Sequence, residues 1–372
     1  MNKKTINKEI RKISNSSSLP LLIFTAVTLL CNYIIKFLIS HSSYSSILRN
    51  QNFIVAVQGI FIYLILIPVL LLIFYKTRGK NTKLRFKDCF AKPQRSFGWC
   101  LKWIIIAIGV SQIFQKLLTF VVAQLQTIFG ITPKTSTLNV DNNYVGYIIL
   151  FIYSVLLAPF FEELLFRGTI YRNTKPMGEW FAIIMTGFAF GLWHGNYQQF
   201  GTAFISGAIM CLMFLKTKSI IPAMICHFIN NLIVETQTIS LTILGTPMSS
   251  TDLEFKLHYM FTKHTFISII YCINNILILI FLIAGIVLLI IEIVKFRKRA
   301  KLSKGKFEIK PIKKQPVGCT YSGRQNLIKT HFGARVLLSC SLKVKKLAVY
   351  FSAPITIISF AVMMVQTVIS AM

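Results

Sequence analysis

Three apolar stretches of this chain carry ionisable or amide side chains that lipid hydrocarbon excludes. The first contains Glu162 and Glu163, the second His194, and the third His227 with Asn231. A charged side chain at the centre of a bilayer costs roughly 2.5–3.5 kcal/mol even on lenient insertion scales, so such groups normally face a protein interior or a watery cavity. Hydrolysis of a peptide bond requires a base for water, groups that hold the water or a metal, and a donor for the oxyanion. The residues therefore indicate an active site within a membrane.

The first stretch reads PFFEELLFRG from Pro159 to Gly168. On a helix, Glu163 and Arg167 are one turn apart and share a face, so we expect them to form an ion pair that makes both charges tolerable. Glu162 is rotated by about 100° from its neighbour on a helix of about 3.6 residues per turn. It therefore needs a different partner.

Taken singly, each stretch has an ordinary structural explanation. The two glutamates could be a charge cluster at the end of a span. His194 follows Trp193, as an interfacial histidine would. His227 and Asn231 share a helical face, and a hydrogen bond between helices would account for both. Only their combination on three separate spans favours chemistry.

The composition is that of an all-α, polytopic membrane protein. Of 372 residues, 54% are hydrophobic and 14% are charged, against about 25% charged residues in soluble domains. Runs of about 20 apolar residues, the length that crosses a bilayer core of roughly 30 Å, recur along the chain. We expect eight spans, near Leu19–Ile39, Phe53–Tyr75, Gly98–Val122, Val145–Phe166, Trp180–His194, Phe200–Leu215, Ile220–Ile239 and Phe266–Val294. The apolar run from Leu347 to Met372 is long enough for a ninth.

The net charge of +30 comes from Lys and Arg that lie between and after the apolar runs. There they would meet anionic lipid head groups, so membrane lipids, and not nucleic acid, are the expected partners. The basic segments alternate along the chain, and the positive-inside rule then places the N-terminus in the cytoplasm of a multi-pass cell-membrane protein. The 8 Cys show no paired spacing, so neither a disulfide framework nor a structural zinc site is indicated.

Four segments follow from this pattern. Residues 1–143 hold the first three spans, 144–239 the polar-bearing core, 240–300 an external loop with the eighth span, and 301–372 a basic extension with an apolar end to which we assign no function. The external loops are expected at Phe129–Asn143 and at Thr246–His264, the latter within segment 240–300.

The depth of the polar groups presents a difficulty. Glu162 is expected near the cytoplasmic end of the fourth span, whereas His194 is expected at the far end of the fifth. Extending the fourth helix past Arg167 to Tyr171, and starting the fifth helix later, would bring the two side chains level.

The three stretches together resemble the signature of the CPBP intramembrane proteases. This family comprises CAAX prenyl endopeptidases and bacteriocin-processing or immunity proteins, also called the Abi family. The motifs are EExxxR at Glu162, Glu163 and Arg167, FxxxH at Phe190 and His194, and HxxxN at His227 and Asn231. No motif position departs from the family pattern, and the resemblance covers Tyr144–Ile239.

The resemblance implies roles for these residues. Glu162 would activate the attacking water together with His194, while His227 and Asn231 would orient the water or stabilise the oxyanion. Glu163, Arg167 and Phe190 would support the site.

The resemblance also implies a metalloprotease-like centre. Glu162, His194 and His227 are then candidate ligands for Zn²⁺, although a glutamate-driven mechanism without metal remains open. The expected substrate is a membrane-associated or leader-bearing peptide or protein. The Ile-, Asn- and Lys-rich composition suggests an AT-rich bacterial genome, which favours bacteriocin processing or self-immunity over prenylated substrates.

Two other classes of protein compete with this interpretation. One is a non-enzymatic immunity or scaffold protein that keeps the motifs for packing. The other is a transporter, because intramembrane Glu and His can relay protons. The sequence shows neither a repeated half nor the paired, Gly/Pro-broken helices that transporters use for substrate sites, which argues against a transporter.

Overall fold

The computed structural model describes residues 3–41, 47, 49–79, 85–130, 140–245, 252–304 and 344–369. Within these ranges every regular element is a helix. Six helices are long and apolar enough to cross a membrane, and two apolar helices are shorter, Glu179–Trp193 and Pro354–Val368. The predicted all-α, polytopic membrane class is therefore confirmed.

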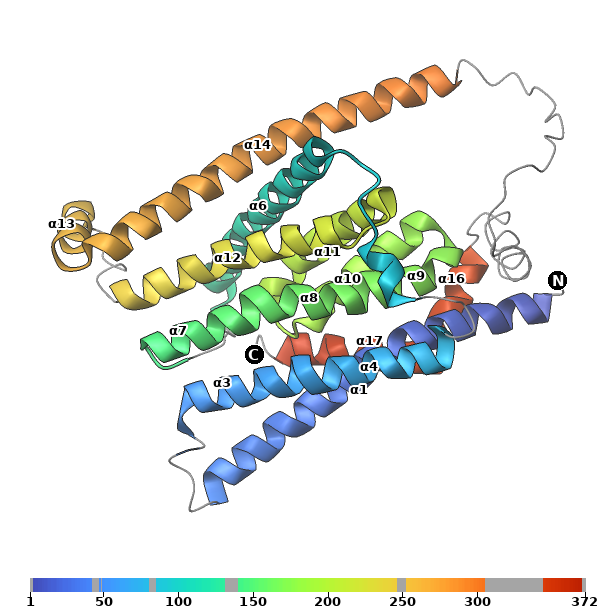
Figure 1. Cartoon of the computed structure of the whole chain (residues 1–372), viewed down its shortest axis with the longest axis horizontal. Coiled ribbons are helices and arrows are strands. Elements are labelled where there is room, and N and C mark those ends of the chain that lie inside the picture. Colours follow the sequence, from blue (N-terminus) through green and yellow to red (C-terminus); the bar gives the residue numbers. More distant parts are fainter. Residues whose placement is uncertain are drawn as a thin grey trace.

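Figure 1 shows the helices in their spatial arrangement. In chain order they are α1 (Lys3–His41), α3 (Gln51–Gly59), η1 (Ile60–Leu66), α4 (Ile67–Phe74), η2 (Tyr75–Gly79), η3 (Phe86–Phe90), α6 (Phe97–Phe129), α7 (Tyr144–Leu150), η4 (Phe151–Leu157), α8 (Ala158–Glu163), η5 (Leu164–Tyr171), α9 (Arg172–Thr174), η6 (Lys175–Met177), α10 (Glu179–Trp193), α11 (Tyr197–Thr217), α12 (Ile221–Leu244), α13 (Leu253–Lys263), α14 (Thr265–Lys304), α16 (Val344–Phe351) and α17 (Pro354–Ile369). The segments α3 to η2 form one continuous helix, and α7 to η6 form another.

Several boundaries differ from the expected spans. Helix α1 begins at Lys3, well before Leu19. Helix α12 has 24 residues, but it is less apolar than the six long helices because it carries the polar residues of the third motif. The external loop expected at Thr246–His264 contains α13, whose N-terminus Asp252 caps by accepting a hydrogen bond from the amide of Phe255 at 3.1 Å. Asp is a favoured N-cap residue, so this part of the loop prediction is wrong.

Other predicted segments fall partly outside the described residues. These are residues 131–139 and 246–251 of the two external loops and residues 305–343 of the basic extension. The apolar end of that extension is described, and it forms α16 and α17 with a break before Pro354. A proline lacks the N–H of a helical bond and disfavours helical backbone in the preceding residue, which accounts for the break.

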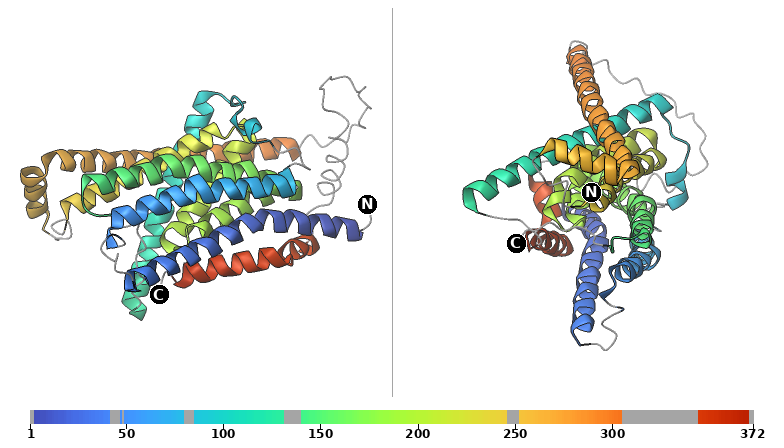
Figure 2. Two further views of the ribbon diagram at one scale, coloured as in Figure 1. Left: turned by 60° about the horizontal axis from the view of Figure 1, so that its bottom comes forward. Right: turned by 90° about the vertical axis from the view of Figure 1, so that its left-hand side faces the viewer.

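The C-terminal helices pack against the N-terminal helix, as the left view of Figure 2 shows. The hydroxyl of Ser14 on α1 donates to the carbonyl of Tyr350 at 2.7 Å and lies 2.6 Å from the hydroxyl of Thr356. Helix α17 also reaches α10, where Phe360 stacks on Phe188 with ring centroids 5.8 Å apart. The apolar end of the extension, for which the sequence suggested no role, thus packs on the other helices through α16 and α17.

Prolines lie inside two of the continuous helices. Pro68 on α4 follows the π-helical segment η1, and Pro159 on α8 follows the π-helical segment η4. Each proline removes one helical hydrogen bond, and the wider turn is a common local adjustment near functional sites. The two wide segments carry Tyr63 and Ser154, which contact the polar motif residues.

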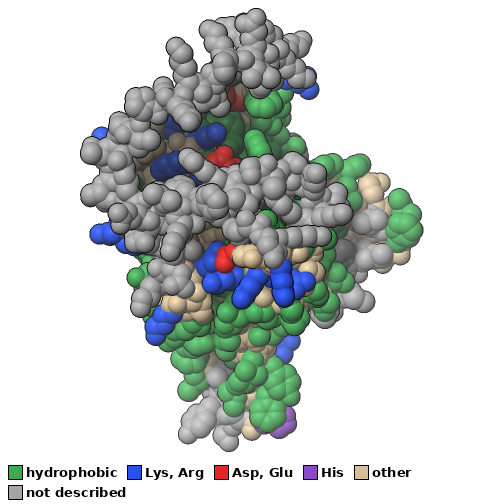
Figure 3. Space-filling model, turned by 90° about the vertical axis from the view of Figure 1, so that its right-hand side faces the viewer, with side chains coloured by type: hydrophobic (Ala, Val, Ile, Leu, Met, Phe, Trp, Pro, Cys, Tyr) green, Lys and Arg blue, Asp and Glu red, His purple; other side chains and the backbone are tan. Residues whose placement is uncertain are grey.

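Lys and Arg side chains gather at one end of the molecule, shown in Figure 3. Two contacts place the ends of four helices there. Arg78 at the end of η2 pairs with Glu9 of α1 at 3.5 Å, and Lys102 early in α6 pairs with Glu292 late in α14 at 2.6 Å. The predicted topology requires these helix ends on one side, and the cytoplasmic orientation stays a prediction.

Helices α6 and α14 approach each other at a pair of buried glycines. A Cβ built on Gly285 would lie 2.9 Å from the Cα of Gly109, and one built on Gly109 would collide with the carbonyl oxygen of Phe281. Small residues permit this backbone approach between membrane helices. A Cβ on Gly98, at the start of α6, would meet nothing within 4 Å.

We expect Gly109→Leu to destabilise the protein by about 1–3 kcal/mol, because added atoms must push α6 and α14 apart. Thermal unfolding of the purified protein in detergent should show a lowered midpoint. Gly98→Leu adds the same side chain to the same helix and should leave the midpoint unchanged. Equal midpoints for the two variants would contradict this helix packing.

Candidate active site

Glu162 lies in the middle of a long helix, and not near its end as the sequence suggested. The helix continues through η5 and α9 to Met177. The predicted extension past Arg167 is therefore present. The fifth helix, α10, does not begin later than expected but starts at Glu179.

The shortness of α10 solves the depth problem. It has 15 residues and ends at Trp193, so His194 lies part-way across the bundle. Glu162 and His194 are each about 16 residues from the turn at Gly178, on opposite sides of it, which at about 1.5 Å per residue places them at similar depth. The two groups are level because one helix is long and the other is short.

A tight turn holds His194 at this depth. Gly195 has a backbone φ of 62°, a conformation that glycine adopts without strain. Asn196 then caps α11 by accepting from the amide of Gln199 at 2.8 Å, and its side-chain amide donates to the carbonyl of His194 at 3.0 Å. The chain reverses within the bundle, and the histidine is fixed at the turn.

A buried ionic network lies behind the site. Nη1 of Arg167 donates to Oε1 of Glu163 at 2.8 Å, and Nη2 donates to the carbonyl of Gly207 at 3.0 Å. Both charged side chains are 0% exposed. Nδ1 of His227 lies 3.0 Å from the same Oε1. The expected ion pair is present, and it also orients His227 from the neighbouring span.

This network fixes how His227 meets the cavity. A carboxylate oxygen only accepts hydrogen bonds, so Nδ1 of His227 carries the hydrogen that faces Glu163. Its other ring nitrogen, Nε2, is left for a molecule in the cavity. A carboxylate behind a histidine commonly sets its tautomer and orientation in catalytic sites.

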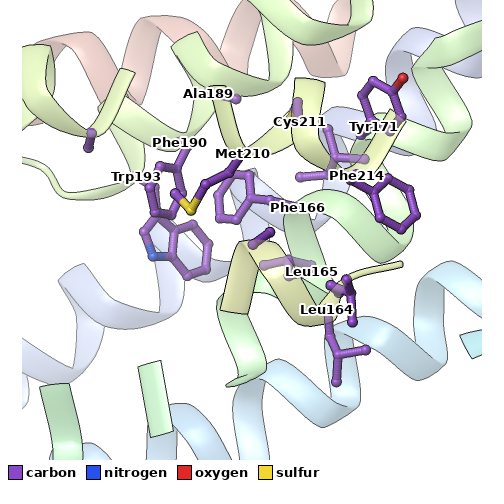
Figure 4. Close-up of a cluster of buried hydrophobic side chains, with 14 of the residues drawn as sticks. Leu164, Leu165, Phe166, Tyr171, Ala189, Phe190, Trp193, Met210, Cys211 and Phe214 are labelled. Atoms are coloured by element: carbon purple, nitrogen blue, oxygen red, sulfur yellow. The ribbon is translucent and has the colours of Figure 1, made fainter. Parts of the chain in front are cut away.

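The side chain of Phe190 joins the two histidines to the ionic network. Its ring centroid lies 5.0 Å from that of His194 and 5.6 Å from that of His227, both edge to face. The guanidinium of Arg167 lies 4.7 Å from the same ring. Figure 4 shows Phe190 grouped with Phe166 and other buried side chains.

The backbone of Phe190 also acts on the site. Nδ1 of His194 lies 2.9 Å from the carbonyl oxygen of Phe190. A carbonyl only accepts, so Nδ1 is the protonated nitrogen, and Nε2 is left for water or substrate. The spacing of four residues places the imidazole of His194 within reach of the carbonyl one helical turn earlier.

Glu162 has the separate partner that helical geometry required. The hydroxyl of Tyr63, from η1, donates to its Oε1 at 2.9 Å. The residue is 6% exposed, and its Oε2 has no hydrogen-bond partner among the described residues. The second oxygen is thus available to a molecule in the cavity.

Asn231 is anchored to the helix that carries Glu162. Its side-chain amide donates to the carbonyl of Ser154 in η4 at 2.8 Å. An amide nitrogen has two hydrogens, so one remains for a further acceptor. No direct bond between Asn231 and His227 is needed, since each is held by a different neighbour.

Two cavities meet at these residues. One of ≈ 460 Å³ is lined by Glu162 and Tyr63, among others. The other, of ≈ 770 Å³, lies between α6, α11 and α12 and is lined by Phe190. His194, His227 and Asn231 line both cavities. The structure therefore brings the four predicted catalytic side chains to one place, with Glu163 and Arg167 buried behind them.

Three further residues of the smaller cavity were missed from the sequence. Tyr63 gave no signal because a single tyrosine in an apolar run is ordinary. Glu235 could have been found, since it is a carboxylate on the same helical face as His227 and Asn231. Gln366 comes from α17, and a Cβ on Gly195 would lie 2.5 Å from its Nε2. Nothing in the local sequence places that helix beside the turn.

The described side chains do not fit a zinc centre. Among the ranges that the structure describes, no group of three or more His, Cys, Asp or Glu is placed to hold a metal ion. A catalytic zinc uses three protein ligands, so we derive no step through a metal.

Comparisons with known proteins agree with this site. Residues 144–233 match the family model described as type II CAAX prenyl endopeptidase Rce1-like. The chain is 23% identical over 184 residues to the membrane-embedded CAAX protease MroQ of Staphylococcus aureus (strain USA300). The aligned part covers 47% of this chain and 72% of the relative. Together these similarities support a protease of the CPBP family. No solved structure matches it.

The matched domain supports an intramembrane endopeptidase, a hydrolase that acts on peptide or protein substrates. The matched segment contains all seven motif residues, from Glu162 to Asn231. The bacterial source of this relative supports the bacterial origin that the Ile-, Asn- and Lys-rich composition suggested.

We expect Arg167→Met to destabilise the protein by about 3–5 kcal/mol, because the buried carboxylate of Glu163 then has no counter-charge. Adding Glu163→Leu should restore most of the stability, since an apolar pair of similar volume is often tolerated. Activity should stay low in the double variant because His227 has lost its orienting carboxylate. Thermal unfolding and peptide cleavage measure the two effects, and a double variant as unstable as the single one would contradict the pairing.

Proposed function

We propose that this protein hydrolyses a peptide bond of membrane-associated or leader-bearing substrates, with water activated by Glu162. The observation that carries the proposal is the place of Glu162. Its carboxylate is buried, has one oxygen free of protein partners among the described residues, and lines a cavity together with His194, His227 and Asn231. A general base and the polar groups that could orient water and stabilise an oxyanion therefore surround one cavity.

The attack follows from the hydrogen bonds. Oε2 of Glu162 takes a proton from water while Nε2 of His194 or His227 accepts the other hydrogen and so orients the oxygen. The water oxygen bonds to the substrate carbonyl carbon, and the free hydrogen of Asn231 donates to the carbonyl oxygen as it becomes negative. Tyr63 keeps the carboxylate of Glu162 in place.

Collapse of the tetrahedral intermediate completes the reaction. The proton on Glu162 passes to the leaving nitrogen, the C–N bond breaks, and the products are a carboxylic acid and an amine. Glu162 therefore serves first as base and then as acid. Atoms and charge balance without any further reactant.

The biological role that we propose is leader processing or self-immunity around bacteriocin peptides. This rests on the family resemblance and on the AT-rich bacterial composition. If the N-terminus is cytoplasmic, as the positive-inside rule predicts, the Lys- and Arg-rich end of the helix bundle faces the cytoplasm. The competing proposal, a non-enzymatic immunity or scaffold protein, needs the folded network but not the free oxygen of Glu162.

We expect Glu162→Gln to lower peptide cleavage by about 10²–10⁴-fold, the usual contribution of general acid–base catalysis. The protein should stay folded, because glutamine still accepts from Tyr63. The measurement is cleavage of a panel of membrane-tethered and leader peptides by purified protein, with Glu179→Gln, a half-exposed carboxylate, as the control. A folded Glu162→Gln protein with normal processing would favour the scaffold.

We expect cleavage to persist after metal is stripped with a chelator, because the proposed steps use only side chains and water. Activity is measured before chelation, after chelation and after adding Zn²⁺ back. A loss on chelation that Zn²⁺ restores would overturn the metal-free mechanism and favour Glu162, His194 and His227 as ligands.

A further inference from the structure

A third carboxylate, Glu235, shares the smaller cavity with Glu162. It lies one turn past Asn231 and two turns past His227 on α12, so the three side chains follow one face of the helix. Ser154 and Glu235 both line this cavity, and the carbonyl of Ser154 accepts from Asn231. Glu235 belongs to the structural unit of the site but has no task in the hydrolysis.

The charges around this cavity are one-sided. No Lys or Arg is found among the described residues that line it, although the whole chain has a net charge of +30. The buried Glu163 has Arg167 as a counter-charge, whereas the buried Glu162 forms no ion pair with a Lys or Arg of the described residues. Carboxylates at membrane depth normally pair with a cation.

The larger cavity on the other side of the histidines has a different character. Its described lining contains no Asp, Glu, Lys or Arg and is rich in amides, including Gln112, Gln115 and Gln199. Amide side chains can bond to the donors and acceptors of a peptide backbone without selecting charge. The two arms of the site therefore differ in the substrate chemistry that they suit.

We propose that the smaller cavity binds a Lys or Arg side chain of the substrate and that Glu235 selects it. This inference rests on the proposed peptidase function. A cation entering the cavity would meet Glu235 and supply the counter-charge that the cavity lacks. The larger cavity holds the uncharged stretch on the other side of the cleaved bond.

The helix sets the distance from the cleaved bond to the basic residue. Glu235 is two turns from His227, or about 12 Å along the helix axis. An extended peptide advances about 3.3–3.6 Å per residue, and a lysine side chain shortens the reach needed. The basic residue is expected roughly two to four residues from the cleaved bond, on one side only.

The test is a lysine scan of a cleaved membrane-tethered peptide with the full-length protein in lipid nanodiscs. Each position on both sides of the bond is changed in turn from Gln to Lys. We expect Lys at the favoured positions to raise kcat/KM by at least about tenfold, a size typical of a partly desolvated charge pair. Lys on the opposite side should give no gain.

Variants of Glu235 separate selection from general catalysis. Glu235→Gln should abolish the preference for Lys, measured as the ratio of kcat/KM for the Lys peptide to kcat/KM for the Gln peptide. Glu235→Lys should shift the preference to a peptide with Glu at the same position. Glu254→Gln removes an exposed carboxylate of α13 and should keep the Lys preference. A wild-type protein without charge preference, or a Glu235→Gln protein that retains it, would overturn the inference.

Binding distinguishes a failure of this inference from a failure of the peptidase. If the wild-type protein cleaves no peptide, fluorescence anisotropy compares binding of the Lys and Gln peptides to wild type and to Glu235→Gln. Tighter binding of the Lys peptide that depends on Glu235 supports the cation site even without hydrolysis. Equal binding of both peptides overturns it.

Discussion

The ion pair between Glu163 and Arg167 is the constraint on which the rest of the site depends. Both side chains are 0% exposed, so neither charge is tolerable without the other. The pair also joins two further helices: Nη2 of Arg167 bonds to the carbonyl of Gly207 on α11, and Oε1 of Glu163, which accepts from Arg167, lies 3.0 Å from Nδ1 of His227 on α12. One desolvated pair thus fixes the relative positions of three helices and the ring of a histidine that lines both cavities.

Helix lengths supply the second constraint, because polar groups cooperate only at the same depth. The helix of Glu162 continues to Met177, whereas α10 stops after 15 residues at the turn of Gly195. A full-length α10 would carry His194 beyond the carboxylate. The short helix is tolerated because Asn196 caps the next helix and bonds to the carbonyl of His194, so the backbone groups at the turn do not need water.

The sequence predicted the side-chain pairs within one helix better than the packing of distant helices around the site. Helical spacing and the cost of charge in hydrocarbon were enough to predict the pair of Glu163 with Arg167 and a separate partner for Glu162, because both depend on local periodicity. The identity of that partner, Tyr63, depends on how distant helices pack. The predicted depth of Glu162 was wrong because Arg167 and the polar residues after it looked like the end of a span. They are in fact buried, Arg167 against α11 and Asn173 against α1. Helix α13 was missed because its 11 residues are too few for a span and mix apolar with charged side chains.

The C-terminal helix shows why an apolar run cannot be assigned a role from composition. Helix α17 packs along α1 and α10 and carries Gln366 to the smaller cavity, beside the turn at Gly195. The matched family segment ends at residue 233, so this wall of the cavity, like Glu235, comes from outside it. The proposed catalytic groups lie within the matched segment, and some of the residues that line the smaller cavity lie outside it. A substitution of Glu235 or Gln366 would change the lining of the smaller cavity. It would not touch the buried ion pair of Glu163 and Arg167 behind the site.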